Sequence, residues 1–159
     1  GLDVFIVRPG SLVGKGHTST TKLLKLVKSG IFPGFKGGAS FVHVDDVARM
    51  YVKAVESLIK GKKGIQIYNL GGNNLTTEEF VKKAQKVFKV KLIKIPNFLL
   101  NFYSKINDKL IYPLTKKSFL TYENFRITNK FFYVDSGKAK HKLDYEIKSL
   151  KTTLEKEWK

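Results

Sequence analysis

The stretch Ser40-Phe-Val-His-Val-Asp-Asp-Val-Ala-Arg-Met-Tyr-Val-Lys-Ala-Val-Glu-Ser-Leu-Ile-Lys-Gly61 decides the fold, because a short apolar run changes here directly into a helical pattern. Phe41, Val42 and Val44 suit a strand. From Asp45 onward, apolar residues recur three or four positions apart. This spacing predicts an α-helix with one apolar face, made of Val47, Ala48, Tyr51, Val52, Val55, Leu58 and Ile59.

Both ends of the predicted helix carry boundary signals. Asp45 and Asp46 are carboxylates near the positive end of the helix dipole, where unpaired backbone N–H groups need acceptors. Lys60 falls in the last turn, and Gly61 stands where a left-handed residue commonly ends a helix. Asp46 is therefore interpreted as a helix-start residue. His43 is interpreted either as a general base or as a buried, hydrogen-bonded side chain, and the absence of a partner nearby in sequence favours the second.

Strands and helices alternate along the rest of the chain. Leu2 to Val7 is an apolar run of strand length, of the kind found in parallel sheets. Ile65 to Leu70 alternates apolar and polar residues, which also predicts a strand. Pro9 ends the first run, and a glycine-rich loop follows. Thr76 with Glu79 three residues on is a capping box that opens another helix. This alternation of strands and helices favours an α/β fold.

The remaining elements are predicted with weaker signals. We expect a helix starting within residues 18–21, a glycine-rich connection over residues 31–39, a strand over 91–95, an aromatic helix from Pro96 to Lys109, a helix or loop over 122–130, a strand over 131–135, a small helix over 137–143 capped by Asp135 and Ser136, and a last helix capped by Ser149.

The composition bounds the function. The 159 residues suit one domain, and 30 basic against 13 acidic residues give a formal net charge of +17. All basic residues except Arg8, Arg49 and Arg126 are lysines, and they are spread along the chain, which favours a solvated surface over nucleic-acid binding. The chain has no cysteine, and its three histidines lie far apart, so we expect no metal site.

No apolar run approaches the roughly 18 to 20 residues that a membrane span needs, and we expect a soluble, cytoplasmic protein. Two other classes stay open. One is a basic nucleic-acid-binding module, and the other is a peripheral membrane-binding module. The second would use the apolar face of the helix from Pro96 to Lys109, with Lys105 and Lys109 near the lipid headgroups.

Three motifs associated with catalysis or nucleotide binding fail. Gly14-Lys15 is typical of a phosphate-binding loop, but Gly16 stands where Ser or Thr should hold magnesium. Tyr112 and Lys116 have the spacing of a proton-transfer pair, but Pro113 makes a regular helix there improbable. No glycine-rich dinucleotide fingerprint follows any predicted strand.

Four segments together resemble one enzyme family. They are Gly1-Leu-Asp-Val-Phe-Ile-Val-Arg-Pro-Gly-Ser-Leu-Val-Gly14, Phe41-Val-His-Val-Asp-Asp-Val-Ala48, Tyr68-Asn-Leu-Gly-Gly72 followed by Leu75-Thr-Thr-Glu-Glu79, and Tyr133-Val-Asp-Ser136 followed by Lys138, Ala139 and Leu143. Their order and separations resemble the extended short-chain dehydrogenases/reductases, the NAD-dependent epimerase/dehydratase family. The resemblance extends over nearly all 159 residues.

This resemblance implies that residues 1–159 are the C-terminal half of such an enzyme: a partial Rossmann-type parallel sheet with a smaller C-terminal helical, substrate-binding lobe. The nucleotide-binding half and the catalytic Tyr-x-x-x-Lys would lie before Gly1, so no catalytic residue is assigned and we expect no turnover from this chain. The cofactor would be NAD or NADP. The cofactor-binding residues would be Pro9, Gly10 and Ser11, and the substrate-binding residues Ser11, Leu12, Val13, Phe41, His43, Phe98 and Phe102.

Departures from the family pattern narrow the expected substrate. Nucleotide-sugar epimerases usually carry Asn at the position of Ser11 and Arg near Ala39, groups suited to a diphosphate. Dihydroflavonol-reductase-like and hydroxysteroid-dehydrogenase-like members, which this chain resembles most, handle less polar ligands. The aromatic residues expected either to line such a pocket or to pack a core are Phe98, Phe102, Tyr103, Phe119, Tyr122 and Phe125. The expected partners are a small-molecule substrate and, in the intact enzyme, a second copy.

Overall fold

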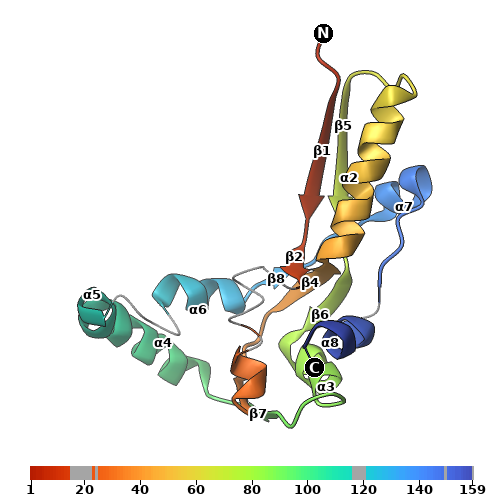
Figure 1. The fold of residues 1–159 in the computed structure, drawn as a ribbon. Helices are drawn as coiled ribbons and strands as arrows, with labels where there is room; N and C mark the ends of the chain where they lie inside the picture. Colours follow the sequence, from red (N-terminus) through yellow and green to blue (C-terminus); the bar gives the residue numbers. More distant parts are fainter. Residues whose placement is uncertain (15–22, 24, 116–120, 149, 159) are drawn as a thin grey trace.

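The computed structural model describes residues 1–14, 23, 25–115, 121–148 and 150–158. The chain folds as an α/β protein in which two packed lobes meet at strand β4 (Gly38–His43) and a helical arm extends to one side (Figure 1). The predicted helix start within residues 18–21, Phe119 and the predicted cap Ser149 lie outside the described residues.

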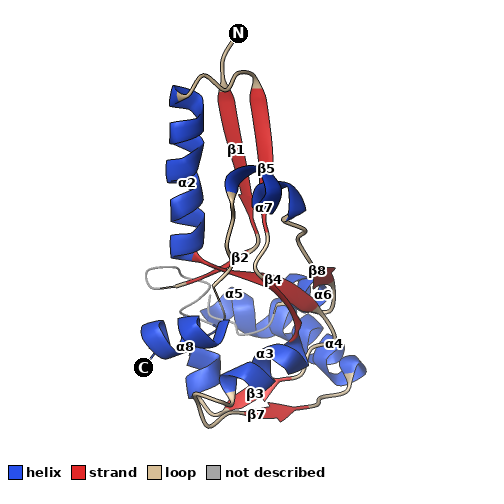
Figure 2. Ribbon diagram, turned by 90° about the vertical axis from the view of Figure 1, so that its right-hand side faces the viewer, coloured by secondary structure: helices blue, strands red, loops and turns tan. Residues whose placement is uncertain are grey.

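The first lobe contains the parallel sheet expected from the sequence. Strand β1 (Val4–Pro9) pairs in parallel with β5 (Ile65–Leu70), with Val4 opposite Ile65 and Pro9 opposite Leu70. Helix α2 (Val44–Ile59) runs alongside these strands (Figure 2). The short helix α7 (Gly137–Leu143) packs against β5. The α/β fold class is therefore confirmed.

The second lobe contains the strands expected near residues 41–44, 91–95 and 131–135, which are β4, β7 (Lys91–Ile93) and β8 (Phe131–Phe132), and three short strands that were not expected. Strand β4 pairs in parallel with β2 (Ser11–Val13) and β8, and antiparallel with β6 (Asn73–Thr76). Strand β3 (Ile31–Pro33) pairs in parallel with β7. The prediction of a glycine-rich connection over residues 31–39 was wrong, because this segment contains β3 and the start of β4. Residues 11–13, expected in a loop, form β2, and residues 73–76, just before the predicted helix at Thr76, form β6.

Most predicted helices form near their expected positions. They are α3 (Thr77–Ala84), α4 (Asn97–Ile106), α6 (Tyr122–Thr128) and α8 (Leu150–Trp158). The capping box of α3 is confirmed, because Glu79 N–H donates to Thr76 Oγ1 and the Glu79 carboxylate accepts from Thr76 N–H at 2.8 Å. At α7, Asp135 rather than Ser136 supplies the side-chain acceptor, which takes the N–H of Gly137 at 3.1 Å.

The chain stays helical at Pro113, contrary to the sequence-based expectation. Helix α4 continues into a π-helical segment η1 (Asn107–Ile111) and then α5 (Tyr112–Thr115). Pro113 is the second residue of α5 and has no backbone N–H to donate within this continuous helical run. Tyr112 N–H donates to Asn107, in the wider π pattern. Because Lys116 lies outside the described residues, the spacing of Tyr112 and Lys116 is not tested.

Each lobe has a hydrophobic core of its own. The core of the first lobe, called here the α2 core, consists of Val42, Val47, Met50, Tyr68, Leu70, Ala139, Leu143 and Tyr145. That of the second, called here the α3 core, consists of Val13, Val27, Phe32, Leu75, Phe80, Val81, Ala84, Val90, Leu150 and Leu154. Strand β4 serves both, because Val42 belongs to the α2 core and Phe41 packs against the α3 core.

The predicted apolar face of α2 was largely wrong. The helix buries Val47, Met50 and Ala54, whereas Ala48, Tyr51, Val52, Val55 and Ile59 are exposed. The helix also begins at Val44, which the sequence assigned to the strand. Its N-cap is His43, whose Nδ1 accepts the N–H of Asp45, while Asp45 and Asp46 lie in the first turn. Gly61 has a positive φ of 85°, as its position after the helix predicted.

Candidate functional site

A cavity of about 600 Å³ lies at the carboxyl end of β1, beside β4. Ligands of open α/β sheets bind at the carboxyl ends of the parallel strands, so this position suits a binding site. Its lining residues are Pro9, Gly10, Ser11, Leu23, Leu26, Phe32, Phe35, Gly38, Ala39, Phe41, Leu75, Thr77, Phe80, Ile127, Thr128, Lys130, Phe132 and Val134.

Between β1 and the cavity, the backbone at Gly10 passes very close to that of Ser40 in β4. Pro9 is the last residue of β1, and the N–H of Gly10 donates to the Leu70 carbonyl at 3.0 Å. A Cβ at Gly10 would lie 2.5 Å from the Ser40 carbonyl oxygen, so no other residue fits without a backbone shift. This close approach places Ser11, the first residue of β2, against the cavity.

Strand β4 supplies one wall of the cavity through its alternation. Ala39 and Phe41 lie two apart and line the cavity, whereas Ser40 and Val42 are fully buried and do not line it. The Phe41 ring packs on Phe80 with centroids 4.8 Å apart. On the buried side, Ser40 Oγ accepts the N–H of Gly72 at 2.8 Å. Contacts on both faces of β4 therefore hold this wall of the cavity in place.

The cavity is chemically apolar. Lys130 contributes the one charged side chain among its described lining residues. The hydroxyls of Thr77 and Thr128 donate to the backbone carbonyls of Gly37 and Phe125, each at 3.1 Å. A ligand with a large apolar surface and few hydrogen-bonding groups suits such a lining.

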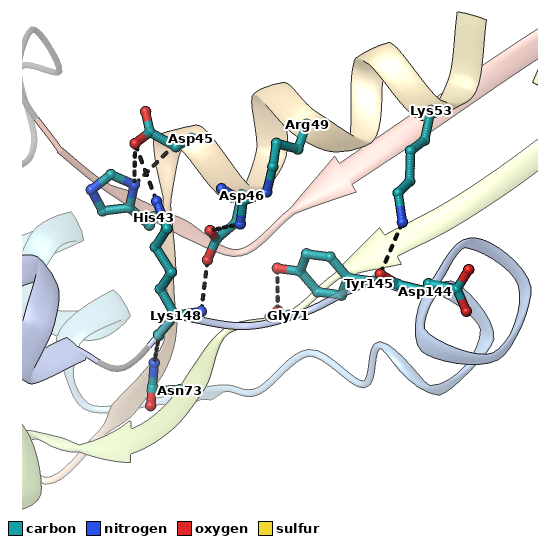
Figure 3. A network of polar contacts seen from close by, with 10 residues as sticks. All are labelled: His43, Asp45, Asp46, Arg49, Lys53, Gly71, Asn73, Asp144, Tyr145 and Lys148. Carbon is teal, nitrogen blue, oxygen red and sulfur yellow. Dashed lines mark hydrogen bonds and ion pairs between the residues drawn. The ribbon is translucent and has the colours of Figure 1, made fainter. Parts of the chain in front are cut away.

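A polar network beside α2 fixes the C-terminal segment rather than forming a reaction site (Figure 3). Asp46 is buried, pairs with the Arg49 guanidinium and accepts the backbone N–H of Lys148 at 2.9 Å. Tyr145 donates its hydroxyl hydrogen to the Gly71 carbonyl at 2.8 Å. Burial, with a smaller contribution from the charge of Asp46, raises the pKa of this tyrosine well above its usual value.

Two more contacts belong to this network. Lys53 Nζ donates to the Leu143 carbonyl at 2.6 Å, and Asn73 Nδ2 donates to the Lys148 carbonyl at 3.0 Å. His43 is 5 % exposed, with its Nδ1 accepting the N–H of Asp45 at 3.1 Å, and it does not line the cavity. Within the described part of the chain, no group of three His, Asp or Glu side chains could hold a metal ion.

The structure brings together some of the residues singled out from the sequence. Of the cofactor set, Pro9, Gly10 and Ser11 all line the cavity. Of the substrate set, Ser11 and Phe41 line it. The others lie elsewhere: Leu12 packs on the α2 core, Val13 belongs to the α3 core, and Phe98 and Phe102 are exposed on α4.

Sequence reasoning missed most of the apolar wall. Of the candidate aromatic set, Phe102 and Tyr122 instead line a separate hollow beside α6. The residues that do line the cavity, such as Phe32, Phe80 and Phe132, come from strands and helices far apart in sequence. Only the alternation of Ala39 and Phe41 along β4 carried a local signal.

No protein-family model and no curated protein matches this sequence. Solved structures do share its fold. A protein named gox2253 is 24% identical with a TM-score of 0.66, covering 97% of this chain and 48% of its own. UDP-N-acetylglucosamine 4-epimerase from Bacillus cereus is 18% identical with a TM-score of 0.60, covering 97% of this chain and 44% of its own.

A third similar structure is UDP-glucose-4-epimerase from Stenotrophomonas maltophila, with bound NAD and formylated UDP-arabinopyranose. It is 17% identical with a TM-score of 0.63, covering 99% of this chain and 47% of its own. Another is a dTDP-glucose 4,6-dehydratase with NAD bound. The chain therefore has the fold of slightly less than half of these epimerase and dehydratase structures.

Proposed function

We propose that this chain is the substrate-binding part of an NAD(P)-dependent oxidoreductase or epimerase that acts on a carbonyl or hydroxyl carbon. The observation that carries the proposal is the cavity at the carboxyl end of β1, where Pro9, Gly10 and Ser11 meet an apolar wall. NAD is present in several solved structures with the same fold. In this proposal, residues 1–159 form the C-terminal half of the enzyme.

The described residues fit only one edge of such a cofactor. Pro9, Gly10 and Ser11 line the cavity and would border a nicotinamide ring there, while Gly10 lets the chain pass close to the Ser40 carbonyl of β4. The sequence offers no glycine-rich strand-to-helix turn for the pyrophosphate. When bound, the cofactor supplies hydride transfer at its nicotinamide. The role of this chain is to hold the substrate beside that ring and to exclude water from it.

The proposed substrate is less polar than a nucleotide sugar and is closer to those of reductase-like members. Two diphosphate-binding groups are absent, since Ser11 and Ala39 stand at the positions concerned. Ala39 itself lines the cavity, and the surrounding side chains are almost all apolar. A phosphate group placed here would lose its hydration, and among the described lining residues only Lys130 carries a positive charge to offset that loss.

A binding experiment on the 159-residue chain tests the substrate class. An apolar fluorescent probe should bind in the cavity and be displaced by flavanone- or steroid-like ketones but not by UDP-glucose. Ala39→Arg should weaken probe binding by about tenfold, because a cation enters the apolar wall. Glu146→Arg, at an exposed position that does not line the cavity, is the control and should leave the affinity unchanged. Displacement by UDP-glucose, or equal binding by both variants, would contradict the proposal.

Catalysis requires a part that these residues do not supply. We expect no turnover and little affinity for NAD or NADP from this chain alone, because its sequence has no glycine-rich turn for the pyrophosphate. Tyr112, the tyrosine of its one Tyr-x-x-x-Lys spacing, is not among the residues that line the cavity. Titration with NADH, followed by its fluorescence, measures the affinity. Robust activity of the 159-residue chain in a reductase assay would contradict the prediction that it has no turnover by itself.

A further inference from the structure

The helical arm formed by α4, η1 and α5 carries a row of exposed apolar side chains. It leaves the body of the molecule next to α6 (Figure 1). Phe98, Phe102 and Leu110 are 69%, 66% and 62% exposed. Leu99, Tyr103, Ile106 and Ile111 are also exposed. Among described residues, no helix has the length and apolar character to cross a bilayer.

The arm does not turn its aromatic side chains inward. Among its described side chains, the buried ones are Leu100, Ser104 and Asn107. Phe98, Phe102 and Ile106 recur every four residues, and these spacings keep them on one side of a helix. An amphipathic helix in a globular protein normally buries this side, so the arm has the opposite arrangement. A continuous exposed apolar surface of this kind marks a binding face.

Two of the three charges along this face are positive. Lys105, Asp108 and Lys109 lie beside Phe102, Ile106 and Leu110 in a hollow of about 480 Å³ next to α6. The carboxylate of Asp108, the one acidic residue of the arm, is engaged within the structure, since its Oδ2 accepts the backbone N–H of Tyr122 at 2.9 Å. Aliphatic lysine stems can pack on an apolar surface while their ammonium groups reach anionic headgroups.

Net charge argues for lipid over a second copy of the chain. Each chain carries a formal charge of +17, so pairing two copies through a face flanked by lysines would bring like charges together. An anionic membrane has the opposite charge, and its fluid surface can receive a convex row of aromatic side chains. We propose that α4, η1 and α5 lie in the interface of an anionic membrane, with Phe98 and Phe102 in the acyl boundary and Lys105 and Lys109 at the headgroups.

Flotation with vesicles tests this proposal, because aggregated protein sediments whereas vesicle-bound protein floats. The 159-residue chain should float with vesicles of phosphatidylcholine mixed with phosphatidylserine, and less with phosphatidylcholine alone. The double variant Phe98→Glu/Phe102→Glu should lower the bound fraction by about tenfold or more. Lys105→Gln/Lys109→Gln should lower it by a similar factor on the mixed vesicles only.

The matched control is Val55→Glu/Ile59→Glu, which alters the exposed face of α2 in the same way and should leave flotation within about twofold of wild type. Circular dichroism checks that all variants are folded. Equal flotation of the phenylalanine variant would mean attraction by charge alone and would overturn the proposal. So would no flotation of the wild type, or an arm variant that converts a dimer to a monomer in light scattering. None of these outcomes depends on the ligand of the β1 cavity.

Discussion

Asp46 and Lys148 lie 102 positions apart in sequence, yet the buried carboxylate of Asp46 accepts the backbone N–H of Lys148 at 2.9 Å (Figure 3). Asp46 therefore does more than begin α2. It holds the segment between α7 and α8 against the first turn of that helix. The same carboxylate pairs with Arg49, so one side chain joins the helix start, the helix surface and the C-terminal segment.

Replacing Asp46 should therefore destabilise the chain. Asp46→Asn should lower the free energy of unfolding by about 1.5 to 3 kcal/mol, because hydrogen bonds to an ionised acceptor are lost in a buried place. Denaturant-induced unfolding measures the change. Asp45→Asn is the matched control: Asp45 is exposed, and its change should stay within about 0.5 kcal/mol. Equal effects of the two variants would contradict the role given to Asp46.

Tyr145 should make stability fall at high pH. Its pKa is raised in the folded chain by burial and by Asp46, so the folded state favours the neutral phenol. The resulting stability is complete below the unfolded pKa of about 10 and is lost as the pH rises above it. Tyr145→Phe should cost about 1 to 2 kcal/mol at neutral pH, because the Gly71 carbonyl loses its donor. Above about pH 10, the free energy of unfolding of the variant should also fall less steeply with pH than that of the wild type. An equal decline in the two proteins would contradict this prediction.

The capping box of α3 gives a prediction at low pH. Thr76→Ala should lower the free energy of unfolding by about 1 kcal/mol, and Thr76→Ser should restore it. The backbone N–H of Thr76, and then its hydroxyl, hold the pKa of Glu79 below its usual value. The stabilisation from this carboxylate is present above the unfolded pKa and is lost as the pH falls through the folded pKa. The difference in stability between wild type and Glu79→Gln should therefore shrink under acid conditions. A constant difference would mean that the carboxylate charge has no part.

The outer face of α2 should make the isolated chain prone to association. Val55 and Ile59 are 56% and 80% exposed, and β1 and β5 pair only with each other among the described strands. Wild type should bind a hydrophobic dye, and Val55→Lys/Ile59→Lys should reduce this binding without loss of stability.

Substitutions on the inner, buried face of α2 should instead lower the stability of the chain. Met50→Ala removes a buried side chain from the α2 core and should cost about 2 to 5 kcal/mol. If the wild-type chain is monodisperse, unfolds cooperatively and does not bind the dye, the prediction of association through the outer face of α2 is wrong.

The sequence predicted elements whose signals are local. The strand at Val4–Pro9 comes from an apolar run and that at Ile65–Leu70 from an alternation of apolar and polar residues, and the capping box at Thr76 and Glu79 is complete within four residues. The short strands β2, β3 and β6 could not be found this way. Their ladder partners lie far along the chain, as at Ile31 and Lys91, and three or four residues carry little pattern of their own.

The sequence-based predictions of the start of α2 and of the cavity lining failed for a similar reason. Val44 suits a strand by its side chain, but the imidazole of His43 provides the cap and starts the helix one residue earlier than the carboxylates indicated. For the cavity, the residues Pro9 to Ser11 were found through a motif, whereas Phe32 and Phe132 reach it only through tertiary pairing. Apolar α2 residues could not be sorted into inner and outer faces, because both stripes are hydrophobic.

Strand β4 sends adjacent side chains into different cores, Phe41 to one and Val42 to the other. A one-residue deletion within it would reverse the facing of every later side chain and empty a place in each core at once. Length changes in the preceding turn around Gly34 need not do this. Evolutionary insertions and deletions in proteins of this shape should therefore gather before β4 and spare the strand itself.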